Sequence, residues 1–159
     1  MDIDTILGAL QGMPVSQAVA ESGWIFPTVE SLHVAAITLV VGSILVVDLR
    51  LVGLVDTARP ARDIESRFLP VTWSAFAVAA LTGLTMFLAK PLSYGHNPVF
   101  LAKLALLTLA AANMVAFHLI VQRAAGDREY GSAARVSGGL SLALWIGVVA
   151  LGRWTGFTL

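Results

Sequence analysis

The sequence contains no cysteine, and this absence removes several kinds of site at once. Without thiols the chain forms no disulfide, offers no thiolate to a metal and cannot attach a c-type haem covalently. Any metal that it binds must therefore be held by histidine, methionine or carboxylate side chains, or by a porphyrin.

Charge is the second property that the sequence has little of. Only 13% of the 159 residues are charged and the net charge is zero at pH 7, whereas 57% are hydrophobic. An ordinary soluble domain has about a quarter of its residues charged. No basic run, zinc-finger spacing or recognition helix points to nucleic acid. The composition therefore predicts an integral membrane protein without a nucleic-acid partner.

The N-terminal segment, residues 1–22, lacks the features of a cleaved signal peptide. It has acidic residues where a signal peptide carries basic ones, and it has no uninterrupted apolar core. Its apolar residues follow helical spacing as far as Pro14. We expect a retained, short amphipathic helix that lies on the membrane surface.

Four stretches are long and apolar enough to cross a membrane, for which about 20 residues are needed. They run over approximately residues 24–47, 68–88, 99–121 and 136–154. The segments between them contain the proline, glycine and charged residues typical of loops. The sequence therefore predicts an all-α integral membrane four-helix bundle over residues 23–159, preceded by the short interfacial segment.

Basic residues are divided unevenly between the two faces of this bundle. The first and third loops with their flanks hold Arg50, Arg59, Arg62, Arg67, Arg123, Arg128 and Arg135, and the opposite face holds Lys90, Lys103 and Arg153. Cytoplasmic loops carry the excess of Lys and Arg, so both termini are expected outside the cytoplasm, in a bacterial inner membrane. We call the face with both termini the terminal face and the opposite one the loop face.

Two rows of small residues predict close helix contacts, because small side chains let helix backbones approach each other in lipid. These rows are Ala75, Ala79 and Gly83 in the second span and Gly139, Ala143 and Gly147 in the fourth.

Side chains from three spans reach a similar depth below the terminal face. His33 lies six residues after Pro27, about 9 Å into the first span at a helical rise of about 1.5 Å per residue. Lys103 lies near the start of the third span, and Met86 near the end of the second. Glu30 shares the helix face of His33. Ionisable groups inside spans are costly and mostly functional, so we expect a ligand, proton or cofactor site here; the alternative is a polar cluster that only fixes helix register.

The other polar residues near the two faces have simpler explanations. Trp24 and Trp154 are typical of an interfacial aromatic belt, and they are also candidates for the walls of the site. His96 is expected to be solvated in its loop. Asp48 and Arg50, at the loop end of the first span, are within reach of water and are expected to pair with the basic loop. The remaining polar residues at the terminal face are Tyr94 and Arg153.

His118 lies about 30 Å from the terminal face by the same helical rise, so it does not obviously meet His33. One haem held by both histidines would require a strongly displaced or tilted third helix. We expect His118 to belong to a second site near the loop face, with Met114, Asn113 or Trp73 as neighbours, or simply to donate to a carbonyl or reach lipid headgroups.

The stretch WIFPTVESLHVAAITLVVGSILVVDLRLVGL, with NPVFLAKLALL and AFH at the two ends of the third span, looks like an uncharacterised bacterial family of small four-helix membrane proteins. More distantly, the chain resembles the HemJ-type protoporphyrinogen oxidases. These are small haem b proteins with an essential histidine early in the first span and a lysine early in the third, and His33 and Lys103 match those places. Glu30 and Asp48 are absent from that pattern, and VVGS replaces an aromatic-rich segment, so haem b binding carries over better than the oxidase activity.

A second distant resemblance is to the CopD-type copper-resistance membrane domain. It implies histidine and methionine ligands, which His33, Met86 and His96 would supply, because thioether and imidazole suit copper. The first span has no methionine cluster, and haem is therefore the preferred cofactor.

The residues and the resemblance together predict a small inner-membrane b-type haem protein for electron transfer or a membrane-linked oxidation. His33 would be an axial ligand, Glu30 would orient it and Lys103 would pair with a propionate. The cofactor-binding candidates are His33, Glu30, Lys103, His118, Trp24 and Arg153, and the metal-binding candidates are His33, His118 and Met86. The expected partners are membrane lipid, a quinone or another redox membrane protein, and a second copy of the chain. The alternatives are a non-enzymatic accessory subunit of a larger membrane complex, a copper-handling protein and a component of an ion or metal permease.

Overall fold

The computed structural model describes residues 2–56, 58–123 and 130–159, and these residues form helices and no strand. The elements are α1 (Ile3–Gln11), α2 (Pro14–Glu21), α3 (Ile25–Val52), α4 (Ala61–Ala89), α5 (Pro91–Gly95), α6 (Pro98–Ala116), the π-helix η1 (Phe117–Gln122) and α8 (Ser132–Thr158). Within the described part of the chain, four helices are long and apolar enough to span a membrane: α3, α4, α6 with η1, and α8. The all-α, four-span prediction is confirmed, and the chain is a multi-pass membrane protein by this criterion. Arg128, one of the basic residues counted above, lies outside the described residues.

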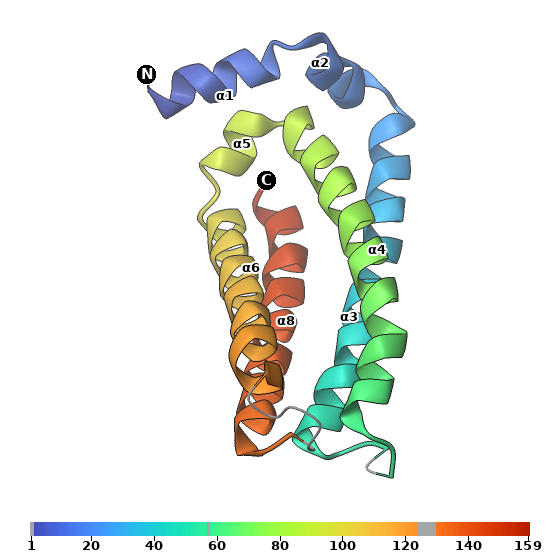
Figure 1. The fold of residues 1–159 in the computed structure, drawn as a ribbon. Helices are drawn as coiled ribbons and strands as arrows, with labels where there is room; N and C mark the ends of the chain where they lie inside the picture. The colour runs from blue at the N-terminus through green and yellow to red at the C-terminus, as the bar shows by residue number, and fades with distance from the viewer. Residues whose placement is uncertain (1, 57, 124–129) are drawn as a thin grey trace.

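The chain before α3 forms two helices rather than one. Pro14 cannot continue α1, but it begins α2, where its missing N–H is not needed. α1 packs against α5, and α2 against α4, so both run across the terminal face (Figure 1). Leu7 of α1 is buried against Gly95. This segment covers part of the terminal face.

Three spans extend further toward the loop face than hydropathy predicts, because α3 reaches Val52, α4 begins at Ala61 and α8 begins at Ser132. Gly53 ends α3 with a φ of 88°. Its N–H donates to Arg50 O at 3.0 Å, and Leu54 N–H donates to Leu49 O at 2.9 Å, which is a Schellman cap. The charged residues of these added turns hide them from a hydropathy search, and Asp48 and Glu65 therefore lie inside helices.

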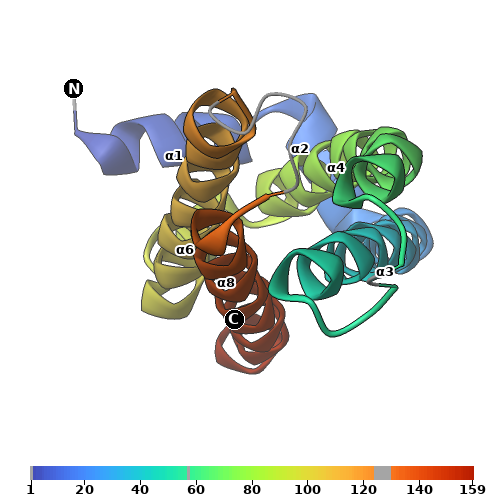
Figure 2. The same cartoon turned by 60° about the horizontal axis from the view of Figure 1, so that its bottom comes forward.

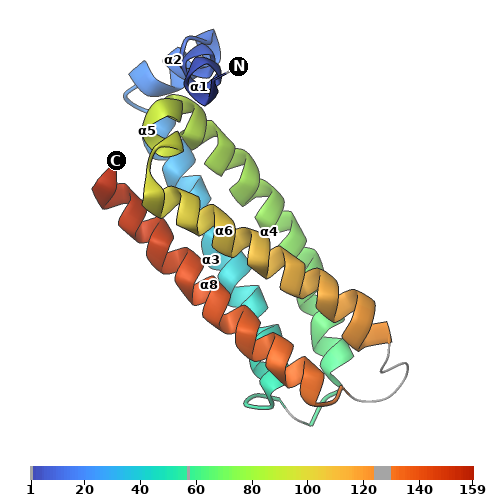
Figure 3. The ribbon, with the colours of Figure 1, turned by 90° about the vertical axis from the view of Figure 1, so that its left-hand side faces the viewer.

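The four long helices form an incomplete ring. α3 packs against α4 and α8, and α8 packs against α6, whereas the backbones of α4 and α6 stay apart in the described residues. Side chains join these two spans near their ends: Phe87 stacks on Phe100 with ring centroids 5.9 Å apart, and Gln122 Nε2 of η1 lies 3.5 Å from Glu65 Oε2. The view from the loop face shows this arrangement (Figure 2), and the side view shows the long helices with α1 and α2 at the terminal face (Figure 3). The ring of helix backbones is thus open between α4 and α6, in the stretch between these two side-chain contacts.

The predicted row of small residues on α4 does face α3. Ala75 and Ala79 are buried. A Cβ placed on Gly83 would lie 3.0 Å from His33 Cε1, so the glycine lets the imidazole approach the α4 backbone closely.

The predicted row on α8 makes a close helix contact at one of its three residues. A Cβ on Gly147 would lie 2.7 Å from Leu106 Cδ1 of α6, as expected for a close contact, whereas Gly139 and Ala143 are exposed. The contact with α3 is made instead by the buried Gly138, where a Cβ would lie 3.0 Å from Leu51 Cβ and 3.1 Å from the Asp48 carbonyl oxygen. The prediction was wrong at Gly139 and Ala143 because α8 packs between α3 and α6 and uses a different helix face for each.

Both ends of the bundle are braced. Leu51, Ala61, Phe117 and Ala134, from the four membrane-spanning segments, form one buried cluster near the loop face. Near the terminal face, Asn97 Oδ1 caps α6 by accepting from Val99 N and Phe100 N, and its Nδ2 donates to Thr158 Oγ1 at 2.8 Å. The start of α6 is therefore fixed against the end of α8.

Candidate functional site

His33, the central residue of the predicted site, is oriented by a threonine of the neighbouring helix. Its Nδ1 lies 2.8 Å from Thr82 Oγ1. Thr82 Oγ1 also lies 2.7 Å from Val78 O and 3.1 Å from Ala79 O, so its own hydrogen is directed to the α4 backbone. The threonine oxygen therefore accepts from His33 Nδ1–H, and Nε2 keeps its lone pair. The sequence pattern predicts Glu30 in this orienting role; the structure gives it to Thr82.

Lys103 lies on α6 and faces α8. Its Nζ lies 3.6 Å from the position of a Cβ on Gly152, so this glycine of α8 leaves room for the ammonium group. Among the described residues Lys103 forms no hydrogen bond or ion pair, although its charge acts on His33. A half-buried ammonium in an apolar bundle is costly unless an anion pairs with it.

The other predicted residues of the terminal face lie at the rim or point away. Glu30 is exposed, and its charge acts on both His33 and Tyr94. Met86 lies one helical turn beyond Thr82 on α4. The more peripheral residues are placed as follows: Trp24 and Trp154 are exposed, the Arg153 guanidinium lies 4.6 Å over the Phe157 ring, and His96 Nε2 lies 2.8 Å from Asp4 Oδ1. The charges of Lys103 and Glu30 thus both act on His33, but His33 packs against α4 and Lys103 against α8.

His118 lies on η1, and π-helical turns of this kind are often found at functional sites. Its Nδ1 is 3.0 Å from Gln122 Oε1, and Gln122 Nε2 is 3.5 Å from Glu65 Oε2. Since the amide nitrogen faces the carboxylate, the amide oxygen accepts from His118 Nδ1–H. His118 Nε2 therefore keeps its lone pair, as His33 Nε2 does.

Glu65 is almost fully buried, with 3% of its surface exposed. Besides Gln122, it accepts a hydrogen bond of 2.8 Å from the Tyr130 hydroxyl, outside the spans. Burial and the bond to this carboxylate raise the pKa of Tyr130 to about 12. The Arg62 guanidinium lies 5.5 Å from the centre of the Tyr130 ring. The carboxylate thus belongs to a connected polar cluster near the loop face.

Asp48 is equally buried, with 5% of its surface exposed, and does not pair with the basic loop as predicted. Ser141 of α8 lies near its carboxyl group, but Oδ2 has no hydrogen-bond partner among the described residues. The interpretation failed because α3 continues past Asp48 and turns it toward α8 rather than toward the loop. Arg50 instead donates to Arg59 O in that loop.

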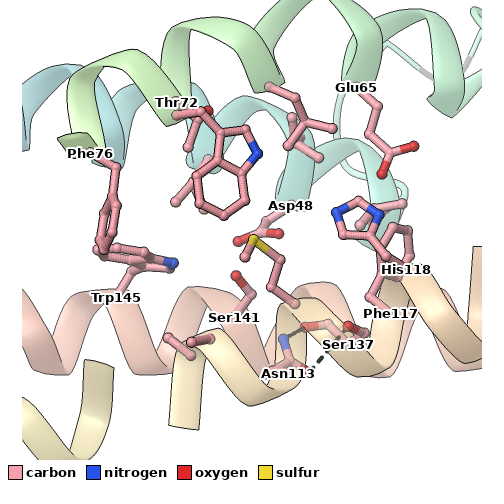
Figure 4. A pocket seen from close by; sticks show the side chains of 18 of the residues that line it. Asp48, Glu65, Thr72, Phe76, Asn113, Phe117, His118, Ser137, Ser141 and Trp145 are labelled. Atoms are coloured by element: carbon pink, nitrogen blue, oxygen red, sulfur yellow. Dashed lines mark hydrogen bonds between the residues drawn. The ribbon is translucent and has the colours of Figure 1, made fainter. Parts of the chain in front are cut away.

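A cavity of about 160 Å³ lies between the four spans in the loop half of the bundle. Asp48 lines it from α3, Glu65 and Phe76 from α4, His118 from η1 and Trp145 from α8. Figure 4 shows Phe76 and Trp145 at one end, Glu65 and His118 at the other, and Asp48 with Ser141 between them. Asn113, Met114 and Trp73 also line the cavity, so the neighbours expected for His118 do gather around it.

His33 and His118 belong to different parts of the molecule. His118 follows Phe117, which packs with Leu51, whereas His33 precedes Leu51 on α3 by eighteen residues, about 27 Å of helix. His118 lines the cavity and His33 does not. In the described residues no group of three or more His, Asp or Glu side chains is arranged to hold a metal ion. A cofactor held by both histidines is therefore not supported by the geometry.

The sequence pattern did not single out Asp48 and Glu65 as members of a site. One signal was present, because Glu65, Leu69, Thr72 and Phe76 recur at helical spacing on one face of α4. Extending the second span back to Ala61 would have placed Glu65 on that face, but Arg62, Asp63 and Arg67 made the segment look like a loop.

Comparison with known proteins adds a family but no activity. The model of a family of unknown function, DUF6644, matches residues 18–158. No curated protein and no solved structure matches the chain. The matched region begins in α2 and ends in α8, so it includes both the surroundings of His33 and the cavity.

Proposed function

The chain belongs to DUF6644, a family of unknown function, and we propose that it is a b-type haem protein for electron transfer, with His33 Nε2 as an axial ligand. We place it in a bacterial inner membrane with the terminal face outside the cytoplasm. The observation that carries the proposal is the hydrogen bond between His33 Nδ1 and Thr82. A quinone or another redox membrane protein would exchange electrons with it.

The Thr82 bond gives His33 the state that an axial ligand needs. Ligating histidines usually donate the second ring N–H to a neighbouring acceptor, which fixes the tautomer and the ring orientation. Thr82 provides that acceptor, and Gly83 lets the ring lie close to α4. The positions of His33 and Lys103, which resemble those of the HemJ-type proteins, support the same assignment.

Lys103 supports the proposal through its charge. A haem carries anionic propionates, and the ammonium group beside Gly152 has no anion of its own among the described residues. Pairing would offset the cost of the half-buried ammonium. When bound, haem supplies one-electron chemistry; the chain supplies the ligand nitrogen, the counter-charge and an apolar surrounding that tunes the potential.

Absorption spectra of the purified protein, expressed with haem supplied, test the proposal. The wild type should show a Soret band and sharp α and β bands after reduction by dithionite, with haem content measured as the pyridine haemochrome. His33→Ala should lose the haem, whereas His96→Ala and His118→Ala, the matched histidine controls, should retain it. Lys103→Gln should lower haem retention.

Thr82→Val separates orientation from folding. It should raise the midpoint potential because His33 loses the acceptor that makes it a more basic ligand, and Thr82→Ser should restore the wild-type value. A wild-type protein without a Soret band, or a His33→Ala variant with full haem content, would overturn the proposal.

A further inference from the structure

We infer that the cavity in the loop half of the bundle binds the ring of a lipid-soluble quinol, which enters from the bilayer between α4 and α6. The site is separate from the haem site proposed at His33. It goes beyond that proposal, because binding is expected whether or not haem is present. No redox step is part of this inference.

The size and the walls of the cavity suit one aromatic ring. Its volume is about 160 Å³, and a cavity of about 150 Å³ is known to hold a benzene molecule. Phe76 and Trp145 form aromatic walls at one end (Figure 4), and Trp73 also lines the cavity. Contacts between aromatic rings contribute more free energy than the burial of their apolar area alone. A planar ring is therefore favoured over an aliphatic chain in this cavity.

The polar atoms that face the cavity require a ligand with hydrogen-bond donors. Asp48 Oδ2 is buried and has no partner among the described residues. His118 Nε2 offers a lone pair because Nδ1–H is directed to Gln122. A buried acceptor without a donor is costly. The two hydroxyl groups of a quinol can each donate a hydrogen bond, one to Asp48 Oδ2 and one to His118 Nε2. The carbonyl oxygens of a quinone can only accept hydrogen bonds.

The open side of the helix ring provides the way in. The backbones of α4 and α6 stay apart within the described residues. Side chains bridge the two spans only near the terminal face, through Phe87 and Phe100, and near the loop face, through Glu65 and Gln122. The cavity lies between these bridges, and both spans contribute to its walls. Trp73 and Phe76 of α4 are both partly exposed, at 49% and 39%. A ring that lies between them and Trp145 would direct an isoprenoid tail outward between α4 and α6, into the acyl chains.

Equilibrium binding of decylubiquinol to the full-length protein in detergent, without supplied haem and under argon, tests the inference. Tryptophan fluorescence and the ligand-dependent rise in Tm are two independent readouts. The wild type should bind decylubiquinol about ten-fold more tightly than decylubiquinone or decanol, as expected for one well-formed buried hydrogen bond. Asp48→Asn and His118→Gln should each weaken quinol binding by about the same factor.

Matched controls are Asp63→Asn and His96→Gln, exposed residues of the same types, which should leave binding unchanged. Asp48→Asn should fold at least as well as the wild type because it removes an unpaired buried carboxylate. Ala111→Trp, which fills the α6 side of the cavity, should abolish binding even if the polar variants prove unstable.

Three results would overturn the inference. The first is equal affinity for decylubiquinol and decanol, which would indicate an apolar crevice without polar recognition. The second is equal affinity of the wild type and Asp48→Asn for the quinol. The third is a Tm that rises with NaCl, but not with choline chloride, in the wild type only, with no effect of quinol; this would make the cavity a cation site.

Discussion

Polar side chains inside the bundle are held mainly by helix carbonyls and by one another. Thr72 Oγ1 donates to Ser43 Oγ at 2.7 Å, and Glu65 accepts from the Tyr130 hydroxyl at 2.8 Å. In lipid an unpaired polar group is costly because water is not at hand to replace its partner. Asp48 Oδ2 departs from this pattern, and this departure distinguishes the cavity from an ordinary polar contact between helices.

The two tyrosines, both outside the spans, should resist ionisation. Burial and the charge of Glu30 raise the pKa of Tyr94, and burial and the bond to Glu65 raise that of Tyr130 to about 12. Since Tyr94 and Tyr130 are the only tyrosines, absorbance at the tyrosinate band should rise at higher pH than it does for the same chain unfolded in denaturant. In Tyr94→Phe the remaining transition should be centred near pH 12.

The same shift gives the pH dependence of stability. Because the folded pKa of Tyr130 exceeds its ordinary value of 10.0, the stabilisation from this residue is complete below pH 10 and is lost as the pH rises through about 12. Glu65→Gln in the Tyr94→Phe background should move the tyrosinate transition to lower pH. A transition near pH 10 in Tyr94→Phe itself would contradict the buried Glu65–Tyr130 bond.

The sequence was informative about His33 and Lys103 because an ionisable residue inside an apolar run is visible without a structure. It was silent on Thr82, whose role appears only when α4 packs against α3 and brings Oγ1 to the imidazole. Asp48 and Glu65 lay among charged residues at the span ends, where burial and exposure look alike in sequence. Contacts between residues distant in sequence, not residue type, decide these roles.

Alanine substitutions at two neighbouring glycines of α8 should affect the stability of the protein differently. In Gly138→Ala the Cβ would lie 3.1 Å from the Asp48 carbonyl oxygen and 3.0 Å from Leu51 Cβ, so α3 and α8 must separate. Overpacking of this kind costs about 1–3 kcal/mol. Thermal or SDS-induced unfolding in detergent should therefore show a clear loss of stability for Gly138→Ala.

Gly139→Ala is the matched control, because a Cβ there meets nothing within 4 Å. It should leave stability unchanged or raise it slightly, since alanine has the higher helix propensity. Equal effects of the two substitutions would mean that α8 does not pack on α3 through Gly138.

At the level of elements, the existence and type of the four spans could be predicted from apolar length alone. Their loop-face ends could not, because α3 and α4 continue through charged turns that are stabilised by packing with η1 and α8. The π-helical turn of η1 also had no sequence signal that we recognised, and it sets the direction in which His118 and Gln122 point.

The whole molecule combines a covered terminal face with an open lateral side. α1 and α2 lie across the ends of the long helices, and Asn97 ties α6 to the C-terminal end of α8. Near the loop face the long helices are joined by a buried cluster. The backbones of α4 and α6 stay apart between the Phe87–Phe100 stack and the Glu65–Gln122 contact. Such a shape favours ligands that arrive through the bilayer over ligands that arrive from water.

Orientation in the membrane can be tested directly because the chain has no cysteine, so that one introduced thiol is labelled without background. Ser93 in α5 and Ala58 in the first loop are both exposed and lie at opposite faces. The excess of arginine at the loop face predicts that this face is cytoplasmic. A membrane-impermeant maleimide should therefore label Ser93→Cys in intact spheroplasts, and Ala58→Cys only after the membrane is permeabilised. The reverse pattern would place the termini in the cytoplasm and would put the proposed haem site, near the terminal face, on the cytoplasmic side.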